Sequence, residues 1–557
     1  RACAFAAGLR ALGLRRGDRV VLMMTNRAEF HIADLGTQLA GGVPISIYNT
    51  SAPEQIVYLL NQSEAAVAVA GGHPFLDRFL EVRDRLTHLR EIVVIDDPDQ
   101  APPSVRSFAD LLAHEPLDLA RAVEASRPDE LATLLYTSGT TGMPKGVMLT
   151  HANLCWTLES LHRALRLPTT GWRLISYLPM AHISDRVFNH YLHVSTGTEV
   201  TICPELARLD EFLLAVRPHC LGAVPRTWEK LHARMTTAIE SLPPDRLAAV
   251  REALDLGLRL NTARSRGQAV DPELARRWDE LDETVLRPLK ATVGLDSCVA
   301  AFSGGAALAR HLFDFYLSLG IPLLELLGMT ESPMITTWDI QSVRPGTVGV
   351  PAPGVEAALL PDGELLLRGG QLSPGYFNDP VRTAESFDAD GWLHTGDVVR
   401  EVGDGYLQVI DRKKELIITS GGKNVSPATI EGALKKLDLV GQVAVVGDDR
   451  PYIAALIVLD PVYAAAWAQR RGIPEDVTSV AAHPDCRAEI QAGVDAINAT
   501  LSRPEQLKKF VVLTRDWTPD SGEVTPTMKL KRRAIQARHA VEIDSMYAGA
   551  PLPRSES

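Results

Sequence analysis

The chain contains 557 residues, 46% of them hydrophobic and 23% charged, a composition typical of globular proteins. A chain of this length is too long for one hydrophobic core, so we expect two or more domains. The formal net charge of -12 at pH 7 argues against a general nucleic-acid-binding protein. No apolar run reaches the roughly 18 residues that would indicate a membrane span, and the start of the sequence has no signal-peptide pattern. Because the first residue is Arg1 and not Met, we expect further residues upstream.

Residues 1–130 alternate helix-like and strand-like segments. Apolar residues with helical spacing and short buried runs follow one another, which predicts a parallel sheet covered by helices. The predicted helices are 1–14 and 28–42, and the predicted strands are 18–25 and 43–49. A second α/β stretch is expected from Leu131 to about Leu327. Within it, about 228–290 is predicted to be a helical insertion on the surface.

The composition changes after Gly346. Residues 346–407 have frequent glycines and short apolar runs, which indicate small antiparallel β-structure. A strand, a glycine-rich turn and a helix follow Asp411, and Pro427 lies near the helix start. We therefore predict a domain boundary at Asp411, with domains 1–410 and 411–545 and a disordered tail, 546–557.

The cysteines indicate neither a zinc site nor a disulfide framework. The six residues are Cys3, Cys155, Cys203, Cys220, Cys298 and Cys486. They are scattered and form no CxxC pair. A reducing cytoplasm is therefore the expected environment.

The most informative stretch is TSGTTGMPKG, residues 137–146, which follows the strand-like LATLLY. Phosphate oxygens are held by backbone N–H groups, hydroxyls and a lysine, and glycine lets the backbone approach closely. This loop supplies all of these, although Lys145 lacks the spacing of a GxxxxGK[ST] P-loop. We interpret it as a phosphate-binding loop rather than a plain polar turn. Its candidate residues are Thr137, Ser138, Gly139, Thr140, Thr141, Gly142 and Lys145.

This loop closely resembles the phosphate-binding signature of the adenylate-forming superfamily, which includes acyl-CoA synthetases, adenylation domains and luciferases. Further stretches resemble the other motifs of that superfamily in its order, so the resemblance covers nearly the whole chain. It implies an α/β fold, with a large N-terminal domain of two parallel-sheet α/β subdomains and a small β-barrel-like subdomain. A smaller, mobile α+β C-terminal domain would follow. The chain is most similar to the bubblegum-like branch of long-chain and very-long-chain fatty acyl-CoA synthetases.

Two stretches resemble segments that contact the nucleotide base and the metal. LLELLGMTES, residues 323–332, is similar to a segment that ends in a metal-binding glutamate. The resemblance implies that Thr330 touches phosphate and that Glu331 helps to hold Mg2+, a hard cation that prefers oxygen ligands. Leu327 stands where the family commonly has an aromatic residue, so ring stacking on adenine is lost there. FSGGAAL resembles the loop beside adenine, with a tight turn as the plain alternative. The implied ATP-binding residues are Gly304, Gly305, Ala306, Glu325, Leu327, Gly328 and Met329.

The stretches after residue 390 resemble the ribose site, the hinge and the CoA passage. Asp397 in GWLHTGD would accept hydrogen bonds from the ribose hydroxyls, unless it serves only its own turn. Asp411 would be the hinge residue, and Arg412 would reach the ribose or phosphate, although a Lys/Arg cluster is by default a solvated face. Gly421 and Gly422 would line the passage for the pantetheine arm of CoA.

The stretch TPTMKLKRRAI resembles the C-terminal motif with the catalytic lysine. Lys529 would bridge the substrate carboxylate and the α-phosphate. Long-chain acyl-CoA synthetases commonly read TPT-x-K-x-K-R, as this chain does. The alternative is a basic surface strand.

Two further residues are candidates for the acyl-binding region. His182 in YLPMAHISDR lies where the family has an aromatic residue or His near the acyl carboxylate, although a lone His is more often structural. Trp228 in AVPRTWEKLHARM would line or gate the acyl channel. A buried structural Trp is at least as common.

The resemblance implies an ATP-dependent ligase. The fatty acid carboxylate would attack the α-phosphorus of ATP, with Mg2+ and Lys529 stabilising the charge, and the CoA thiol would then displace AMP. The C-terminal domain would rotate between the two steps. Expected partners are fatty acid, ATP and CoA, without nucleic acid, in the cytoplasm, and peripheral contact with the inner membrane face stays open. The alternatives are a ligase that delivers the acyl group to a carrier protein and a non-catalytic nucleotide- or lipid-binding regulator.

Overall fold

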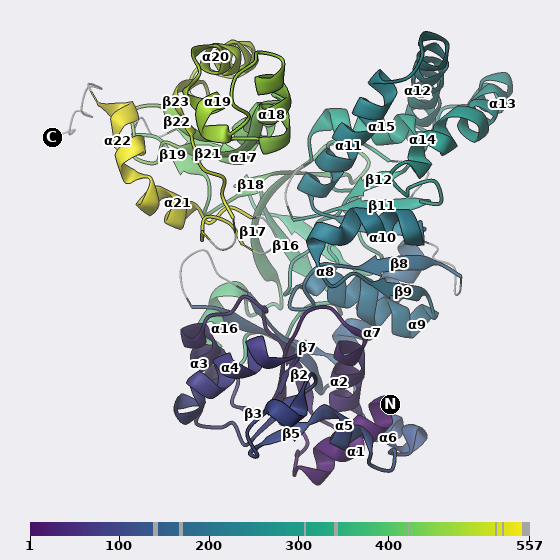
Figure 1. The fold of residues 1–557 in the computed structure, drawn as a ribbon, viewed down its shortest axis with the longest axis vertical. Helices are drawn as coiled ribbons and strands as arrows, with labels where there is room; N and C mark the ends of the chain where they lie inside the picture. Colours follow the sequence, from purple (N-terminus) through teal and green to yellow (C-terminus); the bar gives the residue numbers. More distant parts are fainter. Residues whose placement is uncertain are drawn as a thin grey trace.

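The computed structural model describes residues 1–137, 143–165, 171–305, 308–338, 343–420, 423–518, 521–525 and 529–548. Figure 1 shows three regions: a sheet with its helices at the bottom, a helical region at the upper right and the C-terminal elements at the upper left. Among the described helices, none combines the length and the apolarity needed to cross a lipid bilayer.

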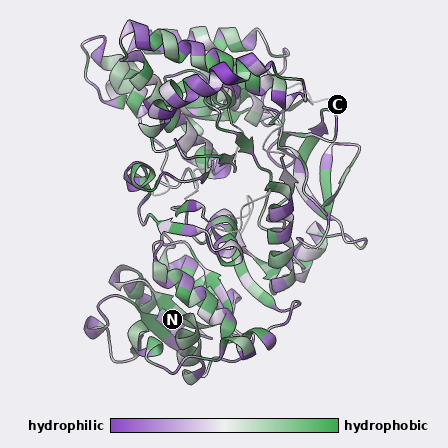
Figure 2. Cartoon of the chain, turned by 90° about the vertical axis from the view of Figure 1, so that its right-hand side faces the viewer, coloured by the Kyte–Doolittle hydropathy of each residue, from purple (hydrophilic) through white to green (hydrophobic). Residues whose placement is uncertain are grey.

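The first sheet has seven strands in the order β5-β4-β3-β1-β2-β6-β7. Its neighbours are parallel except for the antiparallel pair β6–β7. Every residue of β3 is buried, as expected for a parallel strand with helices on both faces, and Figure 2 shows these strands as largely hydrophobic. The strands are β1 (Arg19–Met23), β2 (Val43–Ser46), β3 (Ala65–Ala70), β4 (Glu91–Val94), β5 (Val105–Ser107), β6 (Leu131–Thr137) and β7 (Lys145–Thr150).

Short helices cover this sheet and confirm the predicted alternation. Their bounds are α1 (Ala2–Ala11), α2 (Ala28–Leu39), α3 (Pro53–Gln62), α4 (His73–Glu81), α5 (Phe108–Leu112) and α6 (Leu119–Glu124), with 3-10 turns η1 (Arg83–Arg85) and η2 (Pro98–Gln100). Proline is the first residue of α3 and the second of α4. The N–H groups of the first helical turn have no partner within the helix, so a proline there costs no hydrogen bond.

A second α/β region follows, with two parallel sheets. One pairs β8 (Arg173–Ser176) with β9 (Glu199–Ile202), and the other has the order β10-β11-β12. The remaining elements are α7 (His151–Leu165), α8 (Ile183–Asp185), the π-helix η3 (Arg186–Tyr191), α9 (Leu192–Thr196), η4 (Leu206–Arg208), α10 (Leu209–Val216), β10 (Cys220–Ala223), β11 (Ala300–Ser303), α15 (Arg310–Ser318) and β12 (Leu323–Glu325).

The predicted helical insertion is present but is more than a surface feature. It comprises α11 (Pro225–Glu240), α12 (Pro244–Ser265), α13 (Pro272–Leu281), the π-helix η5 (Asp282–Leu286) and α14 (Arg287–Ala291). Its apolar stripe joins a core cluster with α15 and β10–β12. At Gly257 a Cβ would lie 2.0 Å from the Ser318 carbonyl oxygen, so glycine allows α12 and α15 to approach closely.

The antiparallel β-structure predicted for residues 346–407 is present, and its main sheet runs from Glu356 to Arg412. Four strands pair in the order β15-β16-β17-β18, with β15 and β18 at the edges of the sheet. The elements from β13 onward are β13 (Thr336–Thr337), β14 (Val350–Pro351), β15 (Glu356–Leu359), β16 (Glu364–Arg368), α16 (Pro380–Ser386), β17 (Leu393–Glu401) and β18 (Leu407–Arg412).

The C-terminal elements surround a sheet of order β21-β22-β23. Alternate residues of β22 belong to two core clusters, with Ala455 and Ile457 in one and Ala454 and Leu456 in the other. Since side chains alternate along a strand, both faces of this sheet are covered. The elements are β19 (Ile417–Ile418), β20 (Asn424–Val425), α17 (Pro427–Leu434), β21 (Val440–Val446), β22 (Ile453–Leu459), α18 (Pro461–Gln469), α19 (Val477–Ala482), α20 (Pro484–Asn498), β23 (Leu507–Leu513), α21 (Arg532–Arg538) and α22 (Ala540–Tyr547). The predicted disordered tail, 546–557, is wrong at its start, because Met546 and Tyr547 end α22 and are buried in the second of these clusters. Residues 549–557 lie outside the described residues, so disorder there stays a prediction.

Candidate active site

The two ends of the glycine-rich loop lie side by side. Thr137 is the last residue of β6 and Lys145 the first of β7, and the antiparallel register pairs them directly. The stretch therefore begins and ends on two strands that are paired with each other. Five of its predicted phosphate-binding residues, Ser138, Gly139, Thr140, Thr141 and Gly142, lie outside the described residues.

Lys145 is linked to Glu331 through a residue that the sequence analysis missed, Tyr376. The Lys145 ammonium donates to the Tyr376 hydroxyl at 3.0 Å, and that hydroxyl donates to Glu331 Oε1 at 2.7 Å. Burial lowers the pKa of Lys145, and the nearby carboxylate of Glu331 partly opposes this. Tyr376 follows a Pro-Gly turn in SPGY, and no pattern in the sequence places it beside the loop.

The candidate residues for the nucleotide base lie at the ends of β11 and β12. These strands are parallel neighbours, so their carboxyl ends meet at one edge of the sheet, where ligands of α/β proteins commonly bind. Gly304 and Gly305 follow β11, and Glu325 ends β12. Glu325 accepts a hydrogen bond from the Leu308 amide at 3.1 Å, and its burial raises the pKa of its carboxyl to about 7. Ala306 lies outside the described residues.

The segment from Leu327 to Glu331 turns sharply. Met329 and Ser332 exchange backbone hydrogen bonds of 3.0 and 3.1 Å, which places Thr330 and Glu331 at the tip of the turn. A Cβ on Gly328 would lie 2.8 Å from the Pro333 carbonyl oxygen, so this turn requires glycine there. The Leu327 amide donates to Thr336 Oγ1, and the Leu327 side chain packs against a cluster of buried hydrophobic residues.

Asp397 and Arg412 form an ion pair across β17 and β18. Their register is direct, and Arg412 Nε lies 2.8 Å from Asp397 Oδ1. Among the described residues, no group bonds to Asp397 Oδ2, which is fully buried. Burial raises the pKa of Asp397, while Arg412 and then Lys529 oppose that rise. A buried acceptor without a donor carries a desolvation penalty that a ligand hydroxyl would relieve.

Lys529 reaches the same place from the C-terminal region. The Lys529 amide donates to Thr525 Oγ1 at 3.0 Å. Gly305 has φ +90°, and a Cβ built there would lie 3.3 Å from Lys529 Cε, so the lysine passes directly over this glycine. The surrounding protein lowers the pKa of Lys529, as does Arg412, and Asp397 opposes them. The side chain still keeps a water-accessible surface.

His182 lies near this lysine, whereas Trp228 lies in the protein core. The His182 Nδ1 atom accepts a hydrogen bond from the Ser184 amide at 3.2 Å and caps α8. Burial, and then Lys529, lower the pKa of His182 to about 4. Trp228 is fully buried, donates to the Phe302 carbonyl at 3.2 Å and stacks edge-on against Tyr316. These contacts agree with the structural alternative for Trp228 and do not test a role beside an acyl chain.

Asp411 is bonded to the first turn of α17. Its Oδ1 accepts from the Arg412 amide at 2.7 Å, and its Oδ2 accepts from the Ser426 hydroxyl at 2.5 Å and the Ala428 amide at 3.2 Å. The carboxylate thus ties the end of β18 to the next helix. Gly421 and Gly422, the candidates for the CoA passage, lie outside the described residues.

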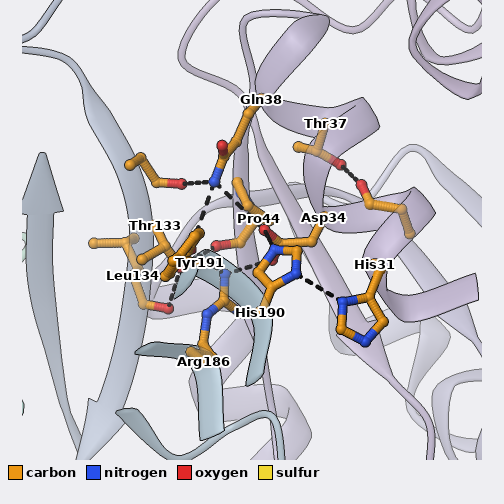
Figure 3. A network of polar contacts seen from close by, with 12 residues as sticks. His31, Asp34, Thr37, Gln38, Pro44, Thr133, Leu134, Arg186, His190 and Tyr191 are labelled. Carbon is orange, nitrogen blue, oxygen red and sulfur yellow. Dashed lines mark hydrogen bonds and ion pairs between the residues drawn. The ribbon is translucent and has the colours of Figure 1, made fainter. Parts of the chain in front are cut away.

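A buried charge network lies between α2 and η3 (Figure 3). Asp34 pairs with Arg186 through Oδ2 and with His190 through Oδ1, the latter at 2.9 Å, and all three side chains are fully buried. His190 in turn contacts His31, Nδ1 to Nδ1, at 2.8 Å. Gln38 donates to the Ala132 carbonyl of β6. The network therefore connects the strand that leads into the glycine-rich loop with the helix that follows His182.

Two family models match the chain. The model described as AMP-binding enzyme matches residues 1–377, and the model described as AMP-binding enzyme C-terminal domain matches residues 414–551.

Curated relatives match along nearly the whole chain. FadD15 of Mycobacterium tuberculosis, named long-chain-fatty-acid–CoA ligase, is 36% identical over 553 residues, which are 98% of this chain and 90% of that protein. ACSBG2 of Gallus gallus, also named long-chain-fatty-acid–CoA ligase, is 34% identical over 581 residues, which are 97% of this chain and 76% of that protein.

Solved structures share the fold. The adenylation domain of a carboxylate reductase from Mycobacterium chelonae has a TM-score of 0.74 at 23% identity. The match covers 98% of this chain and 83% of that structure. ATP-bound MatB from Rhodopseudomonas palustris has a TM-score of 0.70 at 23% identity. The match covers 97% of this chain and 92% of that structure.

Proposed function

Since this chain belongs to the AMP-binding enzyme family, we propose that it activates a long-chain fatty acid with ATP and transfers the acyl group to CoA. The names of FadD15 and ACSBG2 support the long-chain acid and the CoA acceptor. The observation that carries the proposal is the position of Lys529, which comes from the C-terminal region and lies over Gly305 beside the Asp397–Arg412 pair.

Adenylation needs stabilisation of negative charge and little covalent chemistry from the protein. The fatty acid carboxylate attacks the α-phosphorus of ATP, and pyrophosphate leaves. Lys529 stabilises the charge that develops between the carboxylate and the α-phosphate. Lys145 holds the departing pyrophosphate together with Thr137 and the loop that follows it. Asp397 Oδ2 accepts from the ribose, which supplies the donor that this buried oxygen lacks among the described residues.

The residues also fit a bound Mg2+, with Glu331 as the protein ligand. Mg2+ usually takes one or two carboxylates and completes its shell with phosphate and water. Glu331 is buried and uses Oε1 for Tyr376, and among the described residues none donates to Oε2. Bound Mg2+ would neutralise phosphate charge.

The second step uses the same site after AMP becomes the leaving group. The CoA thiol attacks the acyl carbonyl, and Gly421 and Gly422 border its passage. We propose that the C-terminal domain, 411–545, rotates about Asp411 between the steps, so that Lys529 serves adenylation only. The contacts of Asp411 with both β18 and α17 support this hinge position.

The test separates the two half-reactions. Purified protein is incubated with fatty acids from acetate upward, MgATP and CoA, and acyl-CoA is measured by mass spectrometry, with pyrophosphate exchange as the measure of adenylation. We expect exchange without CoA and long-chain acyl-CoA with it. Exchange without any acyl-CoA would instead indicate a different acceptor, and the absence of exchange with every acid would overturn the proposal.

A further inference from the structure

The backbone around Tyr376 is attached to the glycine-rich loop strand. Tyr376 forms an isolated antiparallel bridge with Val147 of β7. Phe377 donates its amide to the Gly146 carbonyl at 2.8 Å, and Met148 donates to the Gly375 carbonyl at 3.1 Å. A displacement of Tyr376 would therefore displace the strand that begins with Lys145.

The Tyr376 hydroxyl separates two opposite charges. A phenol carries one proton and can also accept, so Lys145 donates to it at 3.0 Å while it donates to Glu331 at 2.7 Å. Among the described residues, Lys145 and Glu331 form no direct ion pair within 4.0 Å. Without the hydroxyl, Coulomb attraction would draw the ammonium onto the carboxylate. Such a pair would remove the lysine from phosphate and the carboxylate from a metal ion.

We propose that Tyr376 is a positioning residue that keeps Lys145 and Glu331 apart and aimed at the phosphates and Mg2+ of the nucleotide. The proposal rests on the proposed function only in naming MgATP as the ligand. Tyr376 bonds to Lys145 and Glu331, so its effect should be confined to the part of the nucleotide that these two residues hold.

The test compares nucleotide binding by Tyr376→Phe and by the wild-type protein, with isothermal titration calorimetry. A hydrogen bond to a charged group is worth roughly tenfold in affinity or more, so we expect MgATP to bind about tenfold more weakly. AMP has neither β- nor γ-phosphate and should bind unchanged. The Mg2+ concentration at half-saturation should rise. Tyr376→His, whose ring N–H can donate to Glu331, should recover part of the affinity.

The matched control is Tyr547→Phe, which removes a buried hydroxyl that, among the described residues, donates to the backbone carbonyls of Val446 and Tyr452. Thermal melting of each variant establishes that the protein is folded. Equal loss of MgATP and AMP affinity, or no change in either affinity or Mg2+ requirement, would overturn the positioning role. Because binding is measured without turnover, this result is independent of whether acyl-CoA is formed.

A separate observation concerns the contact between the insertion and the C-terminal region. Arg226 in the first turn of α11 lies 2.6 Å from Asp460, Nη1 to Oδ2. Asp460 also caps α18, with Oδ1 accepting from the Val462 and Tyr463 amides. Arg412 and Lys413, beside the proposed hinge, also pair with residues that precede Asp411. Apart from these, Arg226–Asp460 is the ion pair between described residues that joins the chain before Asp411 to the chain after it.

The geometry assigns Arg226 and Asp460 to a latch that stabilises the arrangement with Lys529 over Gly305. Arg226 and Asp460 are largely shielded from water, with exposed side-chain fractions of 26% and 8%. Removing one partner of such a shielded pair destabilises the arrangement far more than removing one partner of a surface pair. This proposal rests on the proposed rotation, since the pair must break when the C-terminal region moves.

The test measures the half-reactions separately in Asp460→Asn, which keeps a capping side chain, and in Arg226→Gln. We expect pyrophosphate exchange to fall roughly tenfold, while supplied acyl-adenylate reacts with CoA at the wild-type rate or faster. Arg277→Gln, which loses a half-exposed pair with Glu252, is the control. An equal fall in both half-reactions, or no change in exchange, would overturn the latch. If wild-type protein made no adenylate, the proposed function would fail first.

Discussion

Two buried aspartates, Asp34 and Asp397, show how the same side chain serves stability in one region and ligand binding in another. Both are almost inaccessible to water and both face an arginine. At Asp34 burial alone would raise the pKa, but Arg186 and His190 outweigh it and the pKa is lowered. At Asp397 burial prevails over Arg412 and Lys529, and the pKa is raised.

The difference lies in the second carboxylate oxygen. Asp34 uses Oδ2 for Arg186 and Oδ1 for His190, so both carboxylate oxygens have a protein partner. Asp397 uses Oδ1 for Arg412, and its buried Oδ2 has no donor among the described residues. A completely paired carboxylate stabilises the fold, whereas a half-paired one is prepared for a donor from outside the protein.

The largest expected effect is on stability, from Asp34→Ala. This change leaves Arg186 buried without its partner, and removal of one partner of a buried pair lowers the free energy of unfolding by about 3–5 kcal/mol. Chemical denaturation measures it. Glu273→Ala, which removes an exposed pair with Arg276, is the control and should leave stability unchanged. If the two variants unfold alike, the network has no structural role.

The next largest effect is on catalysis, from Lys529→Ala. The loss of a group that stabilises transition-state charge should slow pyrophosphate exchange roughly 100- to 1,000-fold, with stability and ATP affinity nearly unchanged. Lys531→Ala is the matched control, because Lys531 is two residues away on the same basic stretch and is exposed. An unchanged exchange rate would remove Lys529 from the reaction.

A smaller effect is expected from Asp397→Asn. The variant weakens hydrogen bonds to the ribose, which should lower AMP affinity by about 1.5–3 kcal/mol. Stability should be equal or slightly higher, since the unfavourable half-paired charge is gone. Calorimetry with AMP and with pyrophosphate tests this, because pyrophosphate lacks the ribose and should bind as before. A large loss of stability instead would mean that Asp397 resembles Asp34.

The smallest effect is a pH dependence from His31. Burial, and then His190, lower the pKa of His31 to about 3, below the roughly 6.5 of an unfolded histidine. Between these two pH values His31 is protonated in the unfolded chain and neutral in the folded protein. The free energy of unfolding should therefore fall as the pH decreases from about 6.5 toward about 3. His31→Gln should flatten this slope in denaturation curves measured at several pH values. An identical slope would show that His31 titrates normally.

Patterns local in the sequence were predicted well. Hydrophobic alternation indicated the parallel sheet and its helices. The glycine-rich stretch was predicted to follow the strand LATLLY, as it does, whereas the second strand, which begins at Lys145, was not predicted. The insertion was predicted as helical, but its contribution to the core was not, because which helix face is buried depends on the partner it meets.

Contacts distant in sequence were not predictable. Tyr376 lies 231 residues from Lys145, and Arg186 lies 152 residues from Asp34. No residue pattern states that such positions will touch.

By itself, then, the sequence determined the alternation of elements and the chemical groups available along each motif, because propensity, hydrophobic period and loop chemistry act over a few residues. Only the tertiary structure decided which charge faces which, whether a carboxylate has one partner or two, and that Lys529 lies over Gly305. Those outcomes depend on distance and burial, which set the strength of every electrostatic contact and arise when remote segments pack together.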